Sequence, residues 1–174
     1  ATIRRQRQMC IRDSLIFNPQ GHHGFAGFSF HLLFLSMKVL LLNPPFDQVL
    51  VRDNYCCHTS KANYVWAPSD LLYISGTLNH PNIELRVIDA IVEQKRSAEV
   101  EQEIQSFKPN VLIMLSGTVS FDHDIKLLEK AHSKTGCHCY LLGNLPVFNA
   151  KEILEKFDFV EGVFHNFFDT KILD

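Results

Sequence analysis

From Met37 onward, the sequence alternates short apolar runs with segments of helical periodicity. Residues 39–42 and 111–115 are uninterrupted apolar runs, which is typical of strands buried on both faces. Such strands belong to parallel sheets, in which helical crossovers join the strands and cover both sides. The pattern therefore predicts a single α/β domain that extends over residues 37–174.

The segments can be placed by their periodicity and by the turn residues between them. We expect strands over 39–42, 84–88, 111–115, 138–142 and 159–164, and helices over 69–79, 97–107, 121–134 and 149–156. Ser69 is expected to cap the first helix, with Leu72, Ser75 and Gly76 near one face. Because crossovers are right-handed, the economical topology is a doubly wound, flavodoxin-like (Rossmann-like) sheet of order 2-1-3-4-5.

Residues 1–36 differ in composition from the rest of the chain. They begin with a basic stretch that has no period and continue with a segment rich in Phe, Gly and His. One interpretation is a signal peptide, but His31 interrupts the apolar run 25–35, and no small-residue cleavage pattern follows it. The interpretation we adopt is that translation begins at Met37, so that residues 1–36 are a non-native or disordered lead without assigned function.

Composition excludes several functions. The formal net charge of −2 provides no strong field for nucleic acid or an anionic membrane, so neither is expected as a partner. The five cysteines form no zinc-type pair of C-x-x-C motifs and no C-x-x-x-C-x-x-C iron–sulfur motif. An odd cysteine count without a convincing export signal predicts reduced thiols and a cytoplasmic location.

The carboxyl ends of the predicted strands carry small, uncharged residues. In open parallel sheets, ligands bind outside these ends, near the point where the strand order reverses. The candidate binding residues are Asn43, Pro44, Pro45, Ser116, Gly117, Thr118, Ser120, Gly143 and Asn144. Their hydroxyl and amide groups suit a large ligand with amide arms and a phosphodiester tail, whereas no cluster of metal-ligating side chains is predicted. The same residue types also form ordinary turns, and the residues alone leave both interpretations open.

Five segments in a fixed order resemble the cobalamin-binding domain of cobalamin-dependent radical S-adenosylmethionine enzymes. They are MKVLLLNPP from Met37, PSDLLYISGTL from Pro68, VIDA from Val87, SGTVS from Ser116 and LGNLP from Leu142. The resemblance covers the chain after its lead segment. It implies a cobalamin-binding module from the N-terminal part of a larger, methyltransferase-like enzyme. The iron–sulfur cluster and S-adenosylmethionine would belong to a downstream domain, so this chain alone is not expected to be catalytic.

The resemblance also implies roles for the strand-end residues. The first loop, Asn43 to Pro45, would border the corrin ring. The turn after the third strand would contact the tail or the corrin amides through Ser116, Gly117, Thr118 and Ser120, and Gly143 and Asn144 would line the tail pocket. No D-x-H-x-x-G pattern follows the first strand, so no protein histidine is expected below the cobalt. Asn144 replaces a second glycine of the family, and asparagine is the next residue most tolerant of positive φ.

A loop of about 26 residues, from Asn43 to Pro68, is far longer than the usual connection of about 2–6 residues. Its aromatic residues disfavour disorder, and we expect Tyr64 and Trp66 to contact the corrin or a following domain. The run Cys56-Cys57-His58 in this loop is a weak metal candidate, because adjacent cysteines do not easily bind one ion. Aromatic residues near the end of the chain, Phe164, Phe167 and Phe168, suggest that another domain follows.

Other histidines and cysteines have structural interpretations. His123 lies between two aspartates that would favour the start of a helix, and Cys137 and Cys139 are expected to pack in the core.

Three other functions are considered. A signalling receiver requires clustered acids after the first strand, where Asn43 and Pro44 stand instead. A flavin or nucleotide binder requires N–H donors in the same loop, and two prolines lack them. A ligand-free or nucleotide-binding interaction domain with the flavodoxin-like fold is the alternative that we keep.

Overall fold

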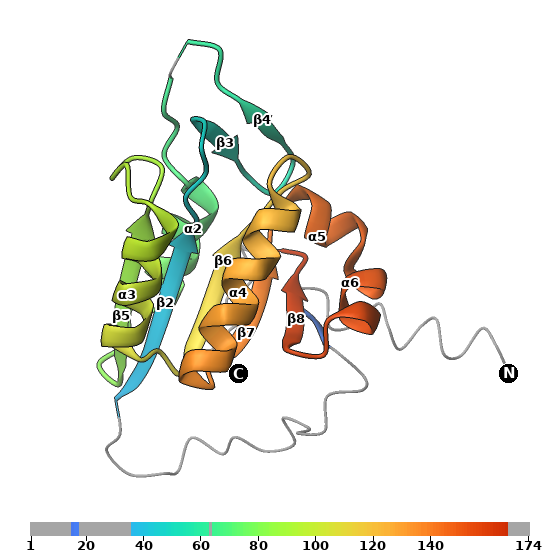
Figure 1. Ribbon diagram of the computed structural model, residues 1–174. Coiled ribbons are helices and arrows are strands. Elements are labelled where there is room, and N and C mark those ends of the chain that lie inside the picture. Colours follow the sequence, from blue (N-terminus) through green and yellow to red (C-terminus); the bar gives the residue numbers. More distant parts are fainter. Residues whose placement is uncertain (1–14, 18–35, 63, 167–174) are drawn as a thin grey trace, which may run out of the picture.

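The computed structural model describes residues 15–17, 36–62 and 64–166. One sheet has the strand order β1-β8-β7-β6-β2-β5, and β3 and β4 form a second, two-stranded sheet (Figure 1). The strands are β1 (Leu15–Phe17), β2 (Met37–Asn43), β3 (Leu50–Arg52), β4 (Cys57–Thr59), β5 (Ile83–Asp89), β6 (Val111–Leu115), β7 (His138–Leu142) and β8 (Val160–Phe164). The helices are α2 (Ser69–Thr77), α3 (Ser97–Phe107), α4 (Phe121–Thr135), α5 (Asn144–Phe148) and α6 (Ala150–Lys156).

The prediction of an α/β fold with a five-stranded parallel sheet is confirmed. Strands β5, β2, β6, β7 and β8 are neighbours in this order, and each pair is parallel. The topology differs in detail from the expectation. Along the chain, the hairpin strands β3 and β4 come between β2 and β5, although they form a separate sheet. In addition, β1 is an antiparallel edge strand beside β8. Apart from residues 15–17 and Ser36, the predicted lead segment lies outside the described residues.

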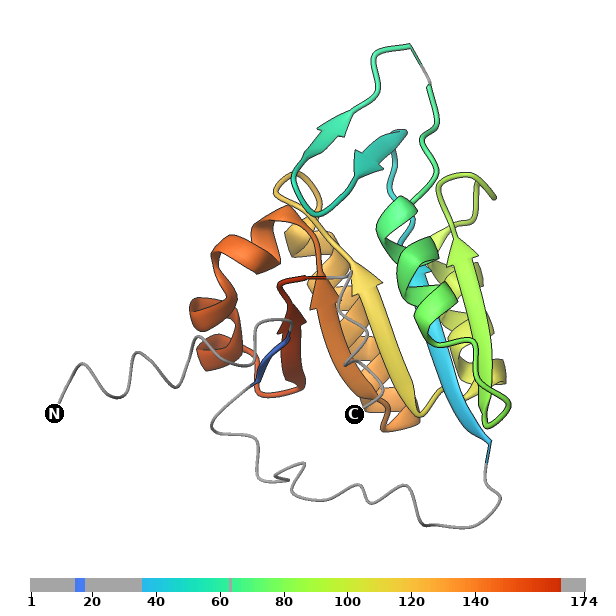
Figure 2. The ribbon, with the colours of Figure 1, turned by 180° about the vertical axis from the view of Figure 1, so that it is seen from behind.

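Helices cover both faces of the sheet, as the view from behind also shows (Figure 2). Successive side chains along β2 point to opposite faces of the sheet. Leu40 and Leu42 pack in the larger core beneath α3, α4 and α6, whereas Val39 and Leu41 pack with α2. Because both faces are covered, residues 40–42 are 0% exposed, which explains their uninterrupted apolar run.

Two helices differ from their predicted forms. Ser69 is the first residue of α2 rather than its cap, because Pro68 occupies the cap position and the Ser69 hydroxyl bonds to Asp70. The buried face of this helix contains Leu71 and Ile74, whereas Leu72, Ser75 and Gly76 lie on its more exposed side, with Leu72 50% exposed. The predicted helix 149–156 corresponds to α6, which begins one residue later, and a short helix that was not predicted, α5, precedes it.

The long loop after β2 is not irregular throughout. Residues 50–52 and 57–59 form an antiparallel hairpin that lies above the carboxyl ends of the sheet strands (Figure 1). None of the helices in the described part of the chain has the length and apolar character that crossing a membrane requires.

Candidate functional site

The β3–β4 hairpin covers the strand ends at which a ligand was predicted. Cys57 of the hairpin lies directly on Gly117, in the turn after β6. A Cβ atom added to Gly117 would lie 2.4 Å from the Cys57 Cβ atom and 2.6 Å from its Sγ atom. Gly117 is therefore required for the close approach of the hairpin.

The side chain of Arg52, in the hairpin, lies at the carboxyl ends of the sheet strands and donates several hydrogen bonds to residues there. Its Nη1 atom donates to Asn43 Oδ1 (3.0 Å) and to the Pro44 carbonyl oxygen (2.8 Å). Its Nε atom donates to Ser120 Oγ (3.0 Å). One buried guanidinium thus holds together the hairpin, the end of β2 and the start of α4. We call Asn43, Arg52, Ser116, Ser120 and Asp124 the strand-end cluster.

Asp124 supplies the charge that balances Arg52 inside this cluster. Arg52 Nη2 lies 3.3 Å from Asp124 Oδ1, and both side chains are fully buried. The hydroxyls of Ser116 and Ser120 donate to Asp124 Oδ2. Burial lowers the pKa of the Arg52 guanidinium, while the charge of Asp124 opposes that shift. A buried ion pair persists when hydrogen bonds satisfy the remaining donors and acceptors, as they do here.

The predicted binding residues are brought together at one edge of the sheet. Most of them are buried: Asn43, Pro44, Pro45, Ser116, Gly117, Ser120 and Gly143. The side chains of Asn43, Ser116 and Ser120 are bonded within the protein rather than directed at an open surface. Thr118 is exposed, and Asn144 is half-buried.

The turn after β7 places its positive φ on Gly143, not on Asn144. Gly143 has φ 120° and ψ 174° and immediately precedes α5. Asn144 is the first residue of that helix, and its Oδ1 atom accepts hydrogen bonds from the Thr118 (3.2 Å) and Leu145 (2.8 Å) amides. The expectation that asparagine is tolerated here for its positive φ is therefore wrong. Its side-chain oxygen links the turns after β6 and β7 instead.

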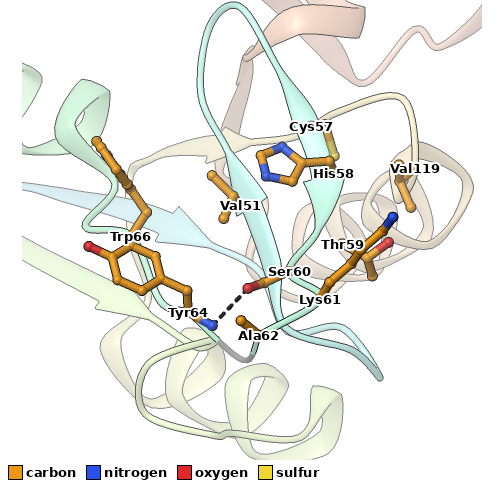
Figure 3. Close-up of a pocket in the computed structure, with 10 residues that line it drawn as sticks. All are labelled: Val51, Cys57, His58, Thr59, Ser60, Lys61, Ala62, Tyr64, Trp66 and Val119. Carbon is orange, nitrogen blue, oxygen red and sulfur yellow. Dashed lines mark hydrogen bonds between the residues drawn. The ribbon is translucent and has the colours of Figure 1, made fainter.

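The structure has a pocket of about 710 Å³ beside the hairpin, which we call the hairpin pocket (Figure 3). It is lined by Val51, Cys57, His58, Thr59, Ser60, Lys61, Ala62, Tyr64, Trp66 and Val119. All but one of these residues belong to the loop between β2 and α2, and Val119 belongs to the turn between β6 and α4. The pocket thus lies where the loops after two neighbouring strands meet.

The lining combines aromatic, hydroxyl and charged groups. Tyr64 and Trp66 have ring centroids 6.2 Å apart and form one wall. The Ser60 hydroxyl accepts a hydrogen bond from the Tyr64 amide (2.7 Å), which fixes the turn that carries Lys61. Aromatic faces and a few placed polar groups are the usual lining of small-molecule sites.

Cysteines outside the pocket have structural roles. Cys56 donates a hydrogen bond to Asp53 (3.1 Å), and burial together with this carboxylate raises the pKa of the Cys56 thiol to about 11. Cys137 and Cys139 are buried in the core, as expected, with their Sγ atoms 3.7 Å apart. Within the described part of the chain, no group of three or more metal-ligating side chains converges.

The acids beside His123 do not have equivalent roles. Asp124 lies in the acidic first turn of α4, as expected, and its carboxylate also turns inward to Arg52. The His123 ring lies near Ser97, with 3.3 Å between Nε2 and Oγ, and contacts Phe46 edge-on.

The close contact between Cys57 of the hairpin and Gly117 can be tested by a double-mutant cycle. Gly117→Ala should lower the free energy of unfolding by about 1–3 kcal/mol, because the new methyl group overlaps Cys57. In a Cys57→Gly background the same change should cost less, since both Cys57 atoms are gone and only Asn144 Oδ1, 2.9 Å from the added Cβ atom, still overlaps it. Urea unfolding of the four proteins measures both values. Equal losses in the two backgrounds would show that Cys57 does not rest on Gly117.

Sequence reasoning did not identify Arg52 as a functional residue. A single arginine in a long loop gives no periodic signal, and its role depends on the path of the hairpin.

Comparison of the chain with protein-family models, with curated proteins and with solved structures found no match.

Proposed function

We propose that this chain is a flavodoxin-like module that binds cobalamin, and that the corrinoid occupies the hairpin pocket above the strand ends. One observation carries the proposal. The pocket is formed by the loops that follow β2 and β6, and the strand order reverses between these two strands. Ligands of open parallel sheets bind at this position. The five sequence segments that resemble the cobalamin-binding domain suggest the identity of the ligand.

The fit of a corrinoid differs between the two candidate places. At the strand ends it is poor, because Asn43, Ser116 and Ser120 are already bonded to Arg52 or Asp124. The hairpin pocket fits better, because it is open space of about 710 Å³ that would admit part of a corrinoid, the rest of which would extend beyond the mouth of the pocket. Trp66 offers an apolar face for a ring, Thr59 offers a hydroxyl for amide arms, and Lys61 offers a cation for a phosphodiester.

In this proposal, the chain binds and orients the cofactor rather than performing a reaction alone. Bound cobalamin would supply a cobalt centre that carries a methyl group. The hairpin forms the floor beneath the ligand, and the strand-end cluster holds this floor in place. A further domain would supply the iron–sulfur cluster and S-adenosylmethionine that the resemblance implies.

The test uses Trp66, which is the only tryptophan of the sequence and lies in the pocket wall. Titration of the full chain with hydroxocobalamin should quench its fluorescence, and gel filtration should then yield coloured protein. Val119→Glu should weaken binding at least about tenfold, or about 1.4 kcal/mol, because it places a charge in the pocket. Val92→Glu is the matched control, since Val92 is similarly exposed (51% against 47%) but does not line the pocket.

Two outcomes would contradict the proposal. Colourless protein with unchanged fluorescence would remove cobalamin as the ligand. If Val119→Glu and Val92→Glu weaken hydroxocobalamin binding equally, the hairpin pocket is excluded as the binding site.

One observation favours the alternative of a ligand-free or nucleotide-binding interaction domain. The strand-end cluster satisfies its own hydrogen bonds, and two aromatic side chains of the loop between β2 and α2 are exposed, with Tyr55 at 75% and Trp66 at 58%. Parallel titrations with FMN and ATP distinguish a nucleotide-binding domain from a ligand-free interaction domain. A response to either nucleotide without one to hydroxocobalamin would favour a nucleotide binder, and no response to any probe would favour the interaction domain.

A further inference from the structure

The turn of the β3–β4 hairpin contacts the start of α2. Within the turn, the Asp53 amide donates to the Cys56 carbonyl oxygen (2.9 Å). The Asn54 amide donates to the helix instead, at 2.6 Å from Asp70 Oδ2. Asp70 belongs to the first turn of α2 and is 3% exposed, and Asn54 is 5% exposed. The contact therefore buries a carboxylate between the hairpin and the helix.

The Asp70 carboxylate has no cationic partner in the described part of the chain. No ion pair of these residues includes it, and its other contact is the Ser69 hydroxyl, 3.4 Å from Oδ1. Burial raises the pKa of the Asp70 carboxyl, the Asn54 hydrogen bond opposes that shift, and the charge of Asp53 adds to it. The charged form of Asp70 therefore costs the fold free energy that a bound cation would offset.

A second atom at this contact lacks a partner. Asn54 Oδ1 is buried, and no residue that the structure describes donates a hydrogen bond to it. Since Oδ1 and the amide that contacts Asp70 belong to one residue, this oxygen lies close to the Asp70 carboxylate. Buried polar atoms are rarely left unpaired unless water or an ion binds them. Amide and carboxylate oxygens are both ligands that hard cations prefer.

We propose that Asn54 and Asp70 form the core of a site for a hard divalent cation, with Ca²⁺ as the occupant. Asn54 Oδ1 and Asp70 Oδ1 would be direct ligands, and the nearby Asp53 carboxylate would add negative charge. Histidine, cysteine and carboxylate side chains do not meet in threes within the described ranges, which disfavours a transition-metal centre. Ca²⁺ differs because it accepts neutral amide oxygens and completes its shell with water. The cation would join the hairpin turn to α2, independently of cobalamin binding.

The experiment uses the full chain after a chelator has removed metal ions. Tb³⁺ replaces Ca²⁺ in oxygen-ligand sites and emits light when a nearby aromatic side chain is excited, and Tyr55 directly follows Asn54. Titration with Tb³⁺ should therefore produce sensitised emission. Ca²⁺ should reverse this emission with half-saturation at about 10⁻⁴–10⁻³ M, the range of weak protein calcium sites. Saturating Ca²⁺ should also raise the urea midpoint of the parent.

Asp70→Asn should weaken Tb³⁺ binding at least about tenfold, because it removes the buried charge but keeps an acceptor for the Asn54 amide. Since the charge at this position is unfavourable without a cation, the urea midpoint of the variant in chelator should be no lower than that of the parent. Asp122→Asn is the matched control, because Asp122 also lies in the first turn of a helix but is exposed. It should bind Tb³⁺ as the parent does.

Asn54→Ala tests the amide oxygen separately, since alanine keeps the backbone amide that contacts Asp70. It should also weaken Tb³⁺ binding. A parent that gives no sensitised emission and no shift of its urea midpoint in Ca²⁺ would overturn the site. Equal affinities of Asp70→Asn and Asp122→Asn, or unchanged binding by Asn54→Ala, would overturn it as well. Titration with hydroxocobalamin tests the proposed function separately.

Discussion

Replacement of Arg52 by methionine is expected to lower the free energy of unfolding by about 3–5 kcal/mol, the usual cost of leaving a buried charge without its partner. Methionine fills the space of the aliphatic stem but removes every donor. Asp124 would then keep the hydroxyls of Ser116 and Ser120 and the neighbouring His123 ring, but no arginine. The end of β2 would also lose its bonds to the hairpin. Urea unfolding of the parent and of the variant measures the difference.

Lys130→Met is the control for the loss of a cation in general. Lys130 lies 3.1 Å from Glu101, but its side chain is 62% exposed, so its removal should cost less than about 1 kcal/mol. Combining Arg52→Met with Asp124→Leu should recover part of the loss, because the unpaired charge is then gone. If Arg52→Met costs no more than Lys130→Met, the guanidinium is not buried against Asp124.

The parallel sheet was predictable because burial on both faces leaves a strong sequence signal. The bounds predicted for α3, β6 and β7 agree with the structure. Strand β6 is apolar throughout, and Pro109 ends the preceding helical pattern. These elements depend on local patterns that the tertiary structure reinforces. Their positions follow from the hydrophobic effect and from the stiffness of proline.

The hairpin was not predictable by the same reasoning. Each of its strands has three residues, which is too short to establish an alternating pattern. Its stability comes from long-range contacts, chiefly those of Arg52 with Ser120 and Asp124, which are far away in the sequence. A charged residue in a loop is ordinarily assigned to the surface, so the pattern concealed a fully buried guanidinium.

The candidate site was predictable in its location but not in its chemical state. Parallel strands bring their carboxyl ends to one edge, so Asn43 and Ser116 were expected to lie close together. Whether their polar atoms are available to a ligand depends on the side chain that reaches them. The sequence does not reveal that Arg52 and Asp124 bond to these atoms. The pocket residues were found only in part, through Tyr64 and Trp66, because aromatic residues in a long loop are unusual.

Replacement of Gly143 by alanine is expected to lower the free energy of unfolding by about 2–6 kcal/mol. The backbone at φ 120° and ψ 174° lies in a region that glycine alone adopts without strain, which accounts for about 1–3 kcal/mol of the loss. The added Cβ atom would lie 1.9 Å from the Ser116 carbonyl oxygen, and relief of this overlap requires backbone movement that accounts for about 1–3 kcal/mol more. Urea unfolding provides the measurement.

Gly76→Ala is the matched control, because no atom beyond its chain neighbours and the adjacent helix backbone lies within 4 Å of an added Cβ atom there. Gly76 is within α2, so alanine should stabilise the protein by about 0.5–1 kcal/mol. Similar values for the two variants would show that the turn after β7 is not held against Ser116. Because Ser116 also bonds to Asp124, its displacement would disturb the cluster that supports the hairpin. Gly143→Ala should therefore weaken hydroxocobalamin binding as well, whereas Gly76→Ala should leave it unchanged.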